Sequence, residues 1–148
     1  MLKIYLDNCC YNRPYDDQTQ IRITLETEAK LYIQSHIIKG DIEMAWSYML
    51  DFENSKNTNA AKKNAILNFS QNAKETVMAS ENILKNAKEI NKSGIKEADA
   101  LHIACAIEAK CDYFVTTDDR VLKYSNDKIS ILDPIDLAKK LSEQEGGK

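Results

Sequence analysis

The sequence lacks a hydrophobic run long enough to cross a membrane. Its longest nearly apolar stretch, residues 100–107, is interrupted by His102 and falls far short of the roughly 20 residues that a spanning helix needs. The first ten residues also lack a basic leader followed by an apolar segment and a small-residue cleavage site. We therefore expect a cytoplasmic protein that does not contact membranes.

Cysteines with the spacing of a structural zinc site are also absent. Cys9 and Cys10 are adjacent, and Cys105 and Cys111 follow about a hundred residues later, without the paired CxxC pattern. Because there is no export signal, free thiols are a better interpretation than disulfides. We expect all four to be small buried hydrophobic side chains.

A strong charge of one sign is missing as well. The 148 residues carry 20 basic and 23 acidic side chains, a net charge of −3, and 43% of them are hydrophobic. Disordered chains combine low hydrophobicity with high net charge, so this composition excludes that class. We expect one folded domain over residues 1–142 and a polar tail over residues 143–148.

The total charge hides a basic middle segment. Residues 56–96 hold eight lysines against three glutamates, which leaves a local charge of +5. These lysines could follow an RNA backbone or simply keep surface helices soluble, and Phe69 is the one aromatic residue among them that could stack on a base. Both interpretations stay open, with Lys85, Lys88 and Lys92 as candidate substrate contacts.

The order of hydrophobic patterns predicts an α/β fold. Alternating or short apolar runs predict strands over residues 2–6, 42–46, 113–116 and 129–131. Helical periodicity predicts helices over residues 21–39, 48–53, 60–69, 77–90, 97–110, 120–124 and 134–141. Strands that alternate with helices pair in parallel and place ligand sites at their carboxyl ends.

Four acidic residues occupy such places and are called the four acids below. They are Asp7, Glu53, Asp99 and Asp118. Two carboxylates about 5 Å apart repel by roughly 3 kcal/mol at an effective dielectric near 20, so a cluster makes sense only around cations. Oxygen ligands favour Mg²⁺ or Mn²⁺ over zinc, and in-line displacement at phosphorus uses such ions. The inferred chemistry is phosphodiester hydrolysis.

Each acid also has a local interpretation. Taken singly, Asp7, Asp99 and Asp118 could equally well cap helices. Glu53, in contrast, falls on the apolar face of its predicted helix, where a carboxylate needs a cation or strong hydrogen bonds. Asp51 is expected on the outward face of the same helix.

Several nearby polar residues are secondary candidates. Arg13 could clamp a phosphate, although a salt bridge with Asp16 or Asp17 is favoured. Asn8 could orient a water molecule or cap the first helix. His102 is expected to be a hydrogen-bonded core histidine rather than a metal ligand.

The segments around these acids resemble the PIN-domain nucleases. In chain order they are residues 4–8, 47–53, 97–104 with their DALHIA run, and 113–118 with their T-x-D ending. The resemblance covers about the whole chain and implies a three-layer fold with a central parallel sheet flanked by helices. It also implies that the four acids are catalytic and bind metal, with Thr116 as a supporting hydroxyl.

The resemblance implies an activity and partners too. The activity is that of an Mg²⁺- or Mn²⁺-dependent endoribonuclease, and one biological role is the toxin of a VapBC-type pair, with an antitoxin and a second copy of the chain as partners. The helical middle, residues 57–92, is longer than in the commonest small toxins of the family. Residues 11–17 resemble a less characterised bacterial subgroup.

Two other functions fit the same chain. A non-catalytic module could keep the fold and use its basic helices to bind RNA or a partner protein. An α/β phosphotransfer receiver could use Asp7 among its acids, but the lysine expected at the end of a final strand is missing. The presence of all four acids favours the nuclease.

Overall fold

The structure is a computed structural model that describes residues 1–146, and within them five strands form a single sheet. The strands are β1 (Lys3–Leu6), β2 (Glu43–Ser47), β3 (Glu75–Val77), β4 (Tyr113–Val115) and β5 (Ser130–Leu132). Their order across the sheet is β3-β2-β1-β4-β5, and each neighbouring pair runs parallel. The predicted α/β class with a central parallel sheet is therefore confirmed.

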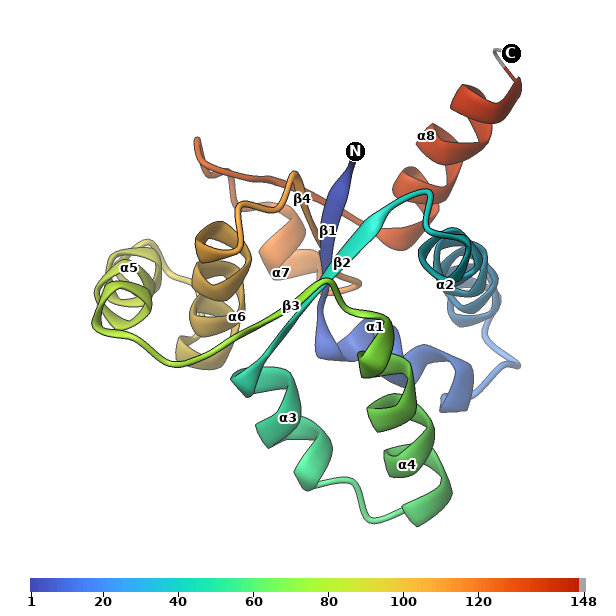
Figure 1. Ribbon diagram of the computed structural model, residues 1–148, viewed down its shortest axis with the longest axis horizontal. Helices are drawn as coiled ribbons and strands as arrows, with labels where there is room; N and C mark the ends of the chain where they lie inside the picture. The colour runs from blue at the N-terminus through green and yellow to red at the C-terminus, as the bar shows by residue number, and fades with distance from the viewer. Residues whose placement is uncertain (147–148) are drawn as a thin grey trace.

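Helices cover both faces of this sheet. They are α1 (Asn8–Asn12), α2 (Ile21–Lys39), α3 (Tyr48–Ser55), α4 (Ala60–Phe69), α5 (Glu81–Lys92), α6 (Glu97–Glu108), α7 (Asp119–Leu122) and α8 (Pro134–Gly146). Helices α5 and α6 lie on one side of the sheet, and α2 and α8 lie on the other (Figure 1). This arrangement gives the three layers that the resemblance implied.

The core lies on both faces of the two central strands. Residues 4–6 of β1 are fully buried, and so are Phe114 and Val115 of β4. A parallel strand that is covered on both faces needs a continuous apolar run, which explains why these segments do not alternate with polar residues. Tyr5 aligns with Ala45 of β2 on one side and with Phe114 on the other, so β1 is the middle of the sheet.

Short-range signals set several helix ends where the sequence predicts them. The Ser47 hydroxyl accepts a hydrogen bond from the Leu50 amide and caps α3. Gly40 has a φ of 86°, a left-handed conformation that side chains disfavour, and its amide closes the last turn of α2. Asn59 caps α4 in the same way as Ser47 caps α3.

Three details of the predicted elements are wrong. Val77 does not begin a helix but ends β3, a three-residue strand whose first two residues are exposed and which gave no alternating signal. The closing helix does not stop at residue 141 but continues to Gly146, into the segment expected as a polar tail, of which residues 147–148 lie outside the described part of the chain. The apolar helical repeat that predicts α2 begins at Ile21 and Leu25, but these two residues are 78% and 49% exposed, so the repeat does not face the core at this end.

The remaining predictions concern membranes and cysteines. None of the helices in the described part of the chain combines the length and apolar character that a membrane crossing requires. The four cysteines are free thiols, as predicted. Cys10, Cys105 and Cys111 are buried, whereas Cys9 is only half-buried and its thiol lies 3.6 Å from the Asp7 carboxylate.

Candidate active site

The strand order brings the ends of distant segments together. β1 lies between β2 and β4, so the residues that follow these strands meet at one edge of the sheet. Asp7 directly follows β1, and Thr116 directly follows β4. The end of β2 leads straight into α3, which carries Glu53, while the first turn of α6 carries Asp99.

Asp7 is the most buried of the four acids, with 5% of the residue exposed. One carboxylate oxygen accepts a hydrogen bond from the amide of Asn8 at 2.8 Å, which caps α1. The other accepts a hydrogen bond from the Thr116 hydroxyl at 2.9 Å. The side chain of Asp7 is therefore fixed by a cap on one oxygen and a hydroxyl on the other.

Glu53 is held by a buried histidine. Its carboxylate pairs with Nε2 of His102, which is 1% exposed, and Nδ1 of the same ring lies 2.6 Å from the Tyr5 hydroxyl. The Tyr5 hydroxyl also lies 2.6 Å from Oγ of Ser47, the cap of α3. His102 is thus the hydrogen-bonded core histidine that the sequence predicts, and it joins α6 to α3.

This pairing changes the proton affinity of both partners. The hydrogen bond from His102 lowers the pKa of Glu53, and a hydrogen bond from the Asn8 side chain acts in the same direction. Burial opposes the charged form of His102, but the hydrogen bond to Glu53 and the charge of Asp7 raise its pKa above the ordinary value. The pair favours an ionised carboxylate beside a protonated imidazole.

Asp99 differs from the other acids because it has no local partner. Its half-buried carboxylate makes no hydrogen bond or ion pair with any residue that the structure describes. Burial raises the pKa of Asp99 to about 6, and the negative charges of Asp7 and Asp118 add to the effect. The acids are therefore close enough for their charges to act on one another.

Asp118 has both a capping contact and a place in the cluster. Its carboxylate accepts a hydrogen bond from the Arg120 amide at 2.9 Å and caps α7. Its own amide donates to Oγ of Thr116 at 3.1 Å, so Thr116 links Asp118 to Asp7. Capping occupies only one of the two carboxylate oxygens, so it does not exclude a second role.

The chemistry of these donors suits a hard cation, although their positions are not those of a closed metal site. Among residues 1–146, no three His, Cys, Asp or Glu side chains converge closely enough to hold a metal ion. Asp7, Glu53 and Asp118 are each turned toward a local partner. The uncompensated charge around Asp99 nevertheless fits a cation that oxygen atoms bind.

Comparison with known proteins gives the family. The model of the PIN domain matches residues 4–126, which include all four acids. The chain belongs to the PIN domain family. No curated protein matches it significantly.

A solved structure has a similar fold. The PIN domain described here is similar to a chain of VapBC2 from Rickettsia felis bound to a DNA fragment from their promoter, with a TM-score of 0.53 and 17% sequence identity. The match covers 89% of this chain and 98% of that chain. At this identity the likeness is one of fold, and it supports the same three-layer arrangement.

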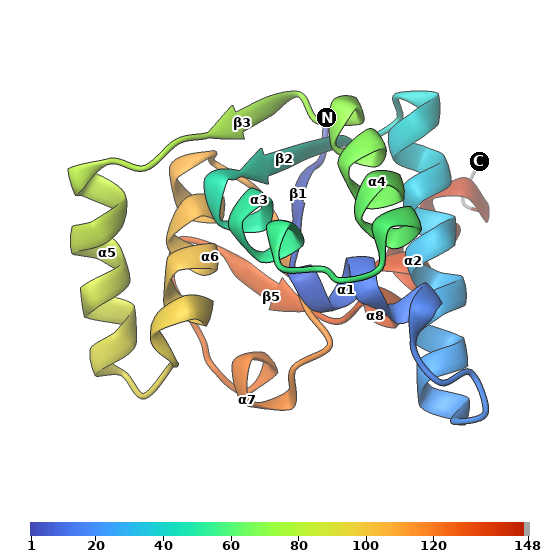
Figure 2. The same cartoon turned by 90° about the horizontal axis from the view of Figure 1, so that it is seen from below.

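The weaker substrate candidates are largely occupied or distant from the acids. Arg13 forms ion pairs of 2.8 Å with Asp16, as the favoured interpretation predicts, and with the buried Glu26, which sequence reasoning missed. Lys92 pairs with Glu89 at 3.4 Å. It lies on α5 with Lys85 and Lys88, and Figure 2 shows α5 packed on the outer side of α6.

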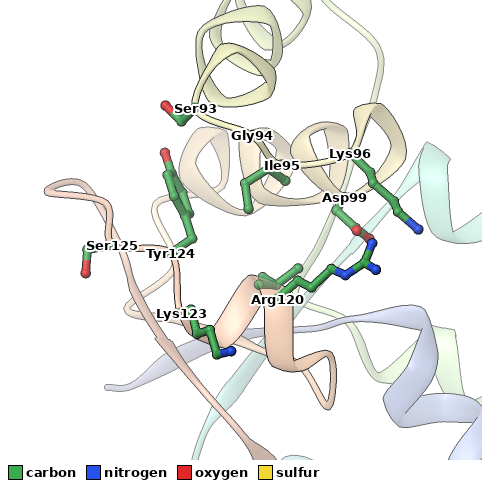
Figure 3. A pocket seen from close by; sticks show the side chains of 10 residues that line it. Ser93, Gly94, Ile95, Lys96, Asp99, Arg120, Lys123, Tyr124 and Ser125 are labelled. Atoms are coloured by element: carbon green, nitrogen blue, oxygen red, sulfur yellow. The ribbon is translucent and has the colours of Figure 1, made fainter.

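Sequence reasoning also missed a hollow in this PIN domain. A cavity of about 310 Å³ opens beside Asp99, between the turn that precedes α6 and the segment that contains α7 (Figure 3). Arg120, Lys96 and Tyr124 line it. The position of Arg120, two residues after Asp118, could have suggested a phosphate contact. A single arginine outside a motif is, however, a weak basis for such a prediction.

Proposed function

We propose that this PIN domain is a divalent-metal-dependent endoribonuclease that hydrolyses phosphodiester bonds in RNA. The observation that carries the proposal is the state of Asp99, a carboxylate that has no partner among the described residues and whose pKa is raised by burial and by the charges of other acids. Clustered carboxylates without a bound cation repel one another, and this repulsion lowers the stability of the folded state. A cation that binds them removes this cost and attracts the anionic backbone of RNA.

Some residues of the site hold the carboxylates in place, and others are available to bind a ligand. Thr116 fixes Asp7, and His102 with Asn8 fixes Glu53, so these two carboxylates keep their orientation when charge changes nearby. Asp99, which no residue in positions 1–146 holds by a hydrogen bond or ion pair, can turn toward a ligand. An Mg²⁺ or Mn²⁺ ion held by the four acids would supply positive charge against the oxygens of the phosphate and the leaving group.

The direct test is cleavage of a labelled single-stranded RNA by protein that has been treated with EDTA. We expect no cleavage without metal and restored cleavage in millimolar Mn²⁺ or Mg²⁺. A variant that lacks all four acids, purified in parallel, controls for contaminating nuclease. Equal cleavage with and without metal would refute the metal dependence, and RNA binding without cleavage under any condition would favour the non-catalytic module.

A toxin role is proposed as the biological setting. The likeness in fold to VapBC2 supports it, and α2 exposes apolar side chains, Ile21 and Leu25, which a partner chain could cover. The partner would be an antitoxin, and a second copy of this chain is the other candidate. Co-expression with the product of the neighbouring open reading frame tests this role, since an antitoxin should co-purify and suppress cleavage.

A further inference from the structure

The cavity beside Asp99 is lined by residues from two separate chain segments. Its wall is built from residues 93–96, Asp99, residues 120–121 and residues 123–125. Asp99 lies at one end of it and Tyr124 at the other (Figure 3). Its volume of about 310 Å³ falls at the lower end of the range of small-ligand pockets, which suits one nucleotide.

Three cationic side chains line this cavity against one acidic side chain. They are Lys96, Arg120 and Lys123, with Asp99 as the acid. None of the three cations forms an ion pair with a residue in the described part of the chain. The cavity therefore presents positive charge that the protein itself does not neutralise.

The other two arginines differ from Arg120, because both form ion pairs with carboxylates. Arg13 pairs with Asp16 and Glu26. Arg22 pairs with Glu26 and with Asp119, the neighbour of Arg120. A guanidinium offers a planar fork that matches the oxygens of a phosphate, and the Arg120 guanidinium has no ion-pair partner within residues 1–146 that would occupy it.

Tyr124 supplies an aromatic surface at the opposite end. The residue is half-buried, and its hydroxyl accepts a hydrogen bond from the Asn126 side chain at 3.0 Å, which limits rotation of the ring. The hydroxyls of Ser93 and Ser125 lie at the same end of the cavity (Figure 3). A fixed ring beside polar groups can stack on a base and leave its edge hydrogen-bonded.

We propose that this cavity is a subsite for one nucleotide of a single-stranded RNA substrate, and this inference rests on the proposed function. Arg120 and Lys96 bind the phosphate of that nucleotide, and its base stacks on Tyr124. Arg120 extends toward the end of the cavity where Asp99 lies (Figure 3), so the bound nucleotide would be a neighbour of the phosphodiester that the four acids cleave. The subsite would set the register of the strand at the site.

The proposal changes the assignment of the basic residues. The lysines of α5 project from a helix that packs on the outer side of α6, whereas Lys96 and Arg120 line a cavity that contains Asp99. Two charges in the cavity should therefore matter more for RNA binding than two charges on α5. This contrast provides a matched control, because Lys85 and Lys88 are also exposed lysines without ion pairs in the described region.

The first experiment measures binding of a labelled single-stranded oligoribonucleotide by fluorescence anisotropy in EDTA, over a series of salt concentrations. The double variant Lys96→Gln, Arg120→Gln should bind about tenfold or more weakly and should lower the salt slope by about 1 to 2, since each lost phosphate contact reduces it. The control, Lys85→Gln, Lys88→Gln, should bind almost as the wild type does. Equal losses in both variants, or no wild-type binding, would overturn the proposal.

The second experiment tests the base contact. Oligonucleotides that carry one abasic nucleotide at successive positions should show a single position at which wild-type affinity falls by about fivefold to tenfold. Tyr124→Phe keeps the ring and should retain this dependence, whereas Tyr124→Leu should abolish it. If Tyr124→Leu binds all of these oligonucleotides as the wild type does, the stacking contact is wrong.

Failure of the subsite can be told apart from failure of the proposed function. Binding in EDTA does not depend on cleavage, so cavity-dependent binding without metal-dependent cleavage would refute the nuclease and keep the subsite. Metal-dependent cleavage with variants that bind as the wild type does would refute the subsite alone. The melting temperatures of the variants should stay near that of the wild type, because Lys96 and Arg120 are exposed.

Discussion

At the scale of single residues, the pKa of Asp99 is set by burial and by charges on residues far from it in the sequence. Burial and the charges of Asp7 and Asp118 raise its pKa to about 6, so the folded protein holds this proton to a higher pH than the unfolded chain does. Ionisation of Asp99 therefore destabilises the folded state. The penalty is absent below about pH 4, the unfolded value, and is complete above about pH 6.

A first prediction follows for the metal-free protein. Asp99→Asn should raise the free energy of unfolding by about 1 kcal/mol at pH 7.5, because it removes the repelled charge, and partial exposure keeps the effect modest. The difference should shrink at pH 5, where Asp99 in the wild type is largely protonated. Thermal melts in EDTA at the two pH values measure it, and a variant that melts lower than the wild type at both would contradict the repulsion.

The same substitution should have the opposite effect on activity. Asp99→Asn and Glu53→Gln should each lower the rate of RNA cleavage in Mn²⁺ by two or more orders of magnitude, about 3 kcal/mol of transition-state stabilisation, because they remove charges that a hard cation needs. The assay is initial-rate cleavage of a labelled RNA. Comparable rates for Asp99→Asn and the wild type would sink the catalytic assignment.

Asp51 provides the control on the same helix as Glu53. It is exposed, as predicted, and its carboxylate accepts a hydrogen bond from the Trp46 indole at 2.8 Å. Asp51→Asn keeps an oxygen that can accept this bond, so its cleavage rate should remain close to that of the wild type. A large loss of cleavage in Asp51→Asn would show that a general disturbance of α3, rather than lost metal binding, causes the loss of activity in Glu53→Gln.

At the scale of elements, α2 turns an unexpected face toward the core. Its buried residues include Glu26 and Lys30, whereas the apolar Ile21 and Leu25 are exposed. The arginines at positions 13 and 22 neutralise Glu26. Lys30 instead lies with its ammonium 5.4 Å from the centre of the Tyr11 ring, and burial lowers its pKa to about 8.

The charge on Lys30 should reduce stability at neutral pH. Since its pKa is lower in the folded state than in the unfolded chain, the penalty is complete below about pH 8 and disappears as the pH rises toward about 10.5. Lys30→Met keeps the stem and removes the ammonium. We expect its free energy of unfolding to exceed that of the wild type by about 1 kcal/mol at pH 7, since lost contacts to Gln34 and the rings offset part of the gain.

Urea unfolding at pH 7 and pH 10 measures this effect. The advantage of Lys30→Met should narrow at the higher pH, where the wild-type lysine loses its proton. Lys39→Met, on the same helix but 62% exposed at its side chain, should change stability by no more than about 0.5 kcal/mol. Lower stability of Lys30→Met at pH 7 would mean that the cation–ring contacts outweigh desolvation.

At the scale of the whole molecule, the parallel sheet concentrates negative charge at one edge. β1 lies between β2 and β4, so the acids that follow these three strands lie at the same edge of the sheet. A cation that binds only the folded form stabilises it by mass action, by about 2.7 kcal/mol at a hundred times the dissociation constant. Millimolar Mn²⁺ should therefore raise the melting temperature of EDTA-treated protein.

The metal effect can be assigned to the cluster with one further variant. Asp99→Asn should show a much smaller rise in melting temperature with Mn²⁺, even though its metal-free form starts from a higher temperature. Calorimetry or a fluorescence melt over a series of Mn²⁺ concentrations gives the metal-free melting temperature and its rise with Mn²⁺. If the wild type melts at the same temperature with and without Mn²⁺, the four acids do not form a cation site.

Local sequence patterns were sufficient for the features that a few neighbouring residues can specify. Ser47 and Asn59 cap helices with their own hydroxyl or amide, and Gly40 ends α2 because it tolerates a positive φ. Alternation over residues 2–6 predicted β1, the apolar run over residues 113–116 predicted β4 as a buried strand, and the alternation of strands with helices predicted their parallel pairing. β3 could not be predicted in this way, because its three residues gain their strand conformation from pairing with β2.

Which charged groups lack an ion-pair partner among the described residues depends on the three-dimensional fold. Arg22 pairs with Asp119 across 97 positions, and Glu53 pairs with His102 across 49, so no local pattern shows that these groups are occupied. Asp99 and Arg120 have no such partners in the part of the chain that the structure describes. Ion pairing depends on distances of a few ångströms in space, and the fold sets those distances between residues that the sequence keeps far apart.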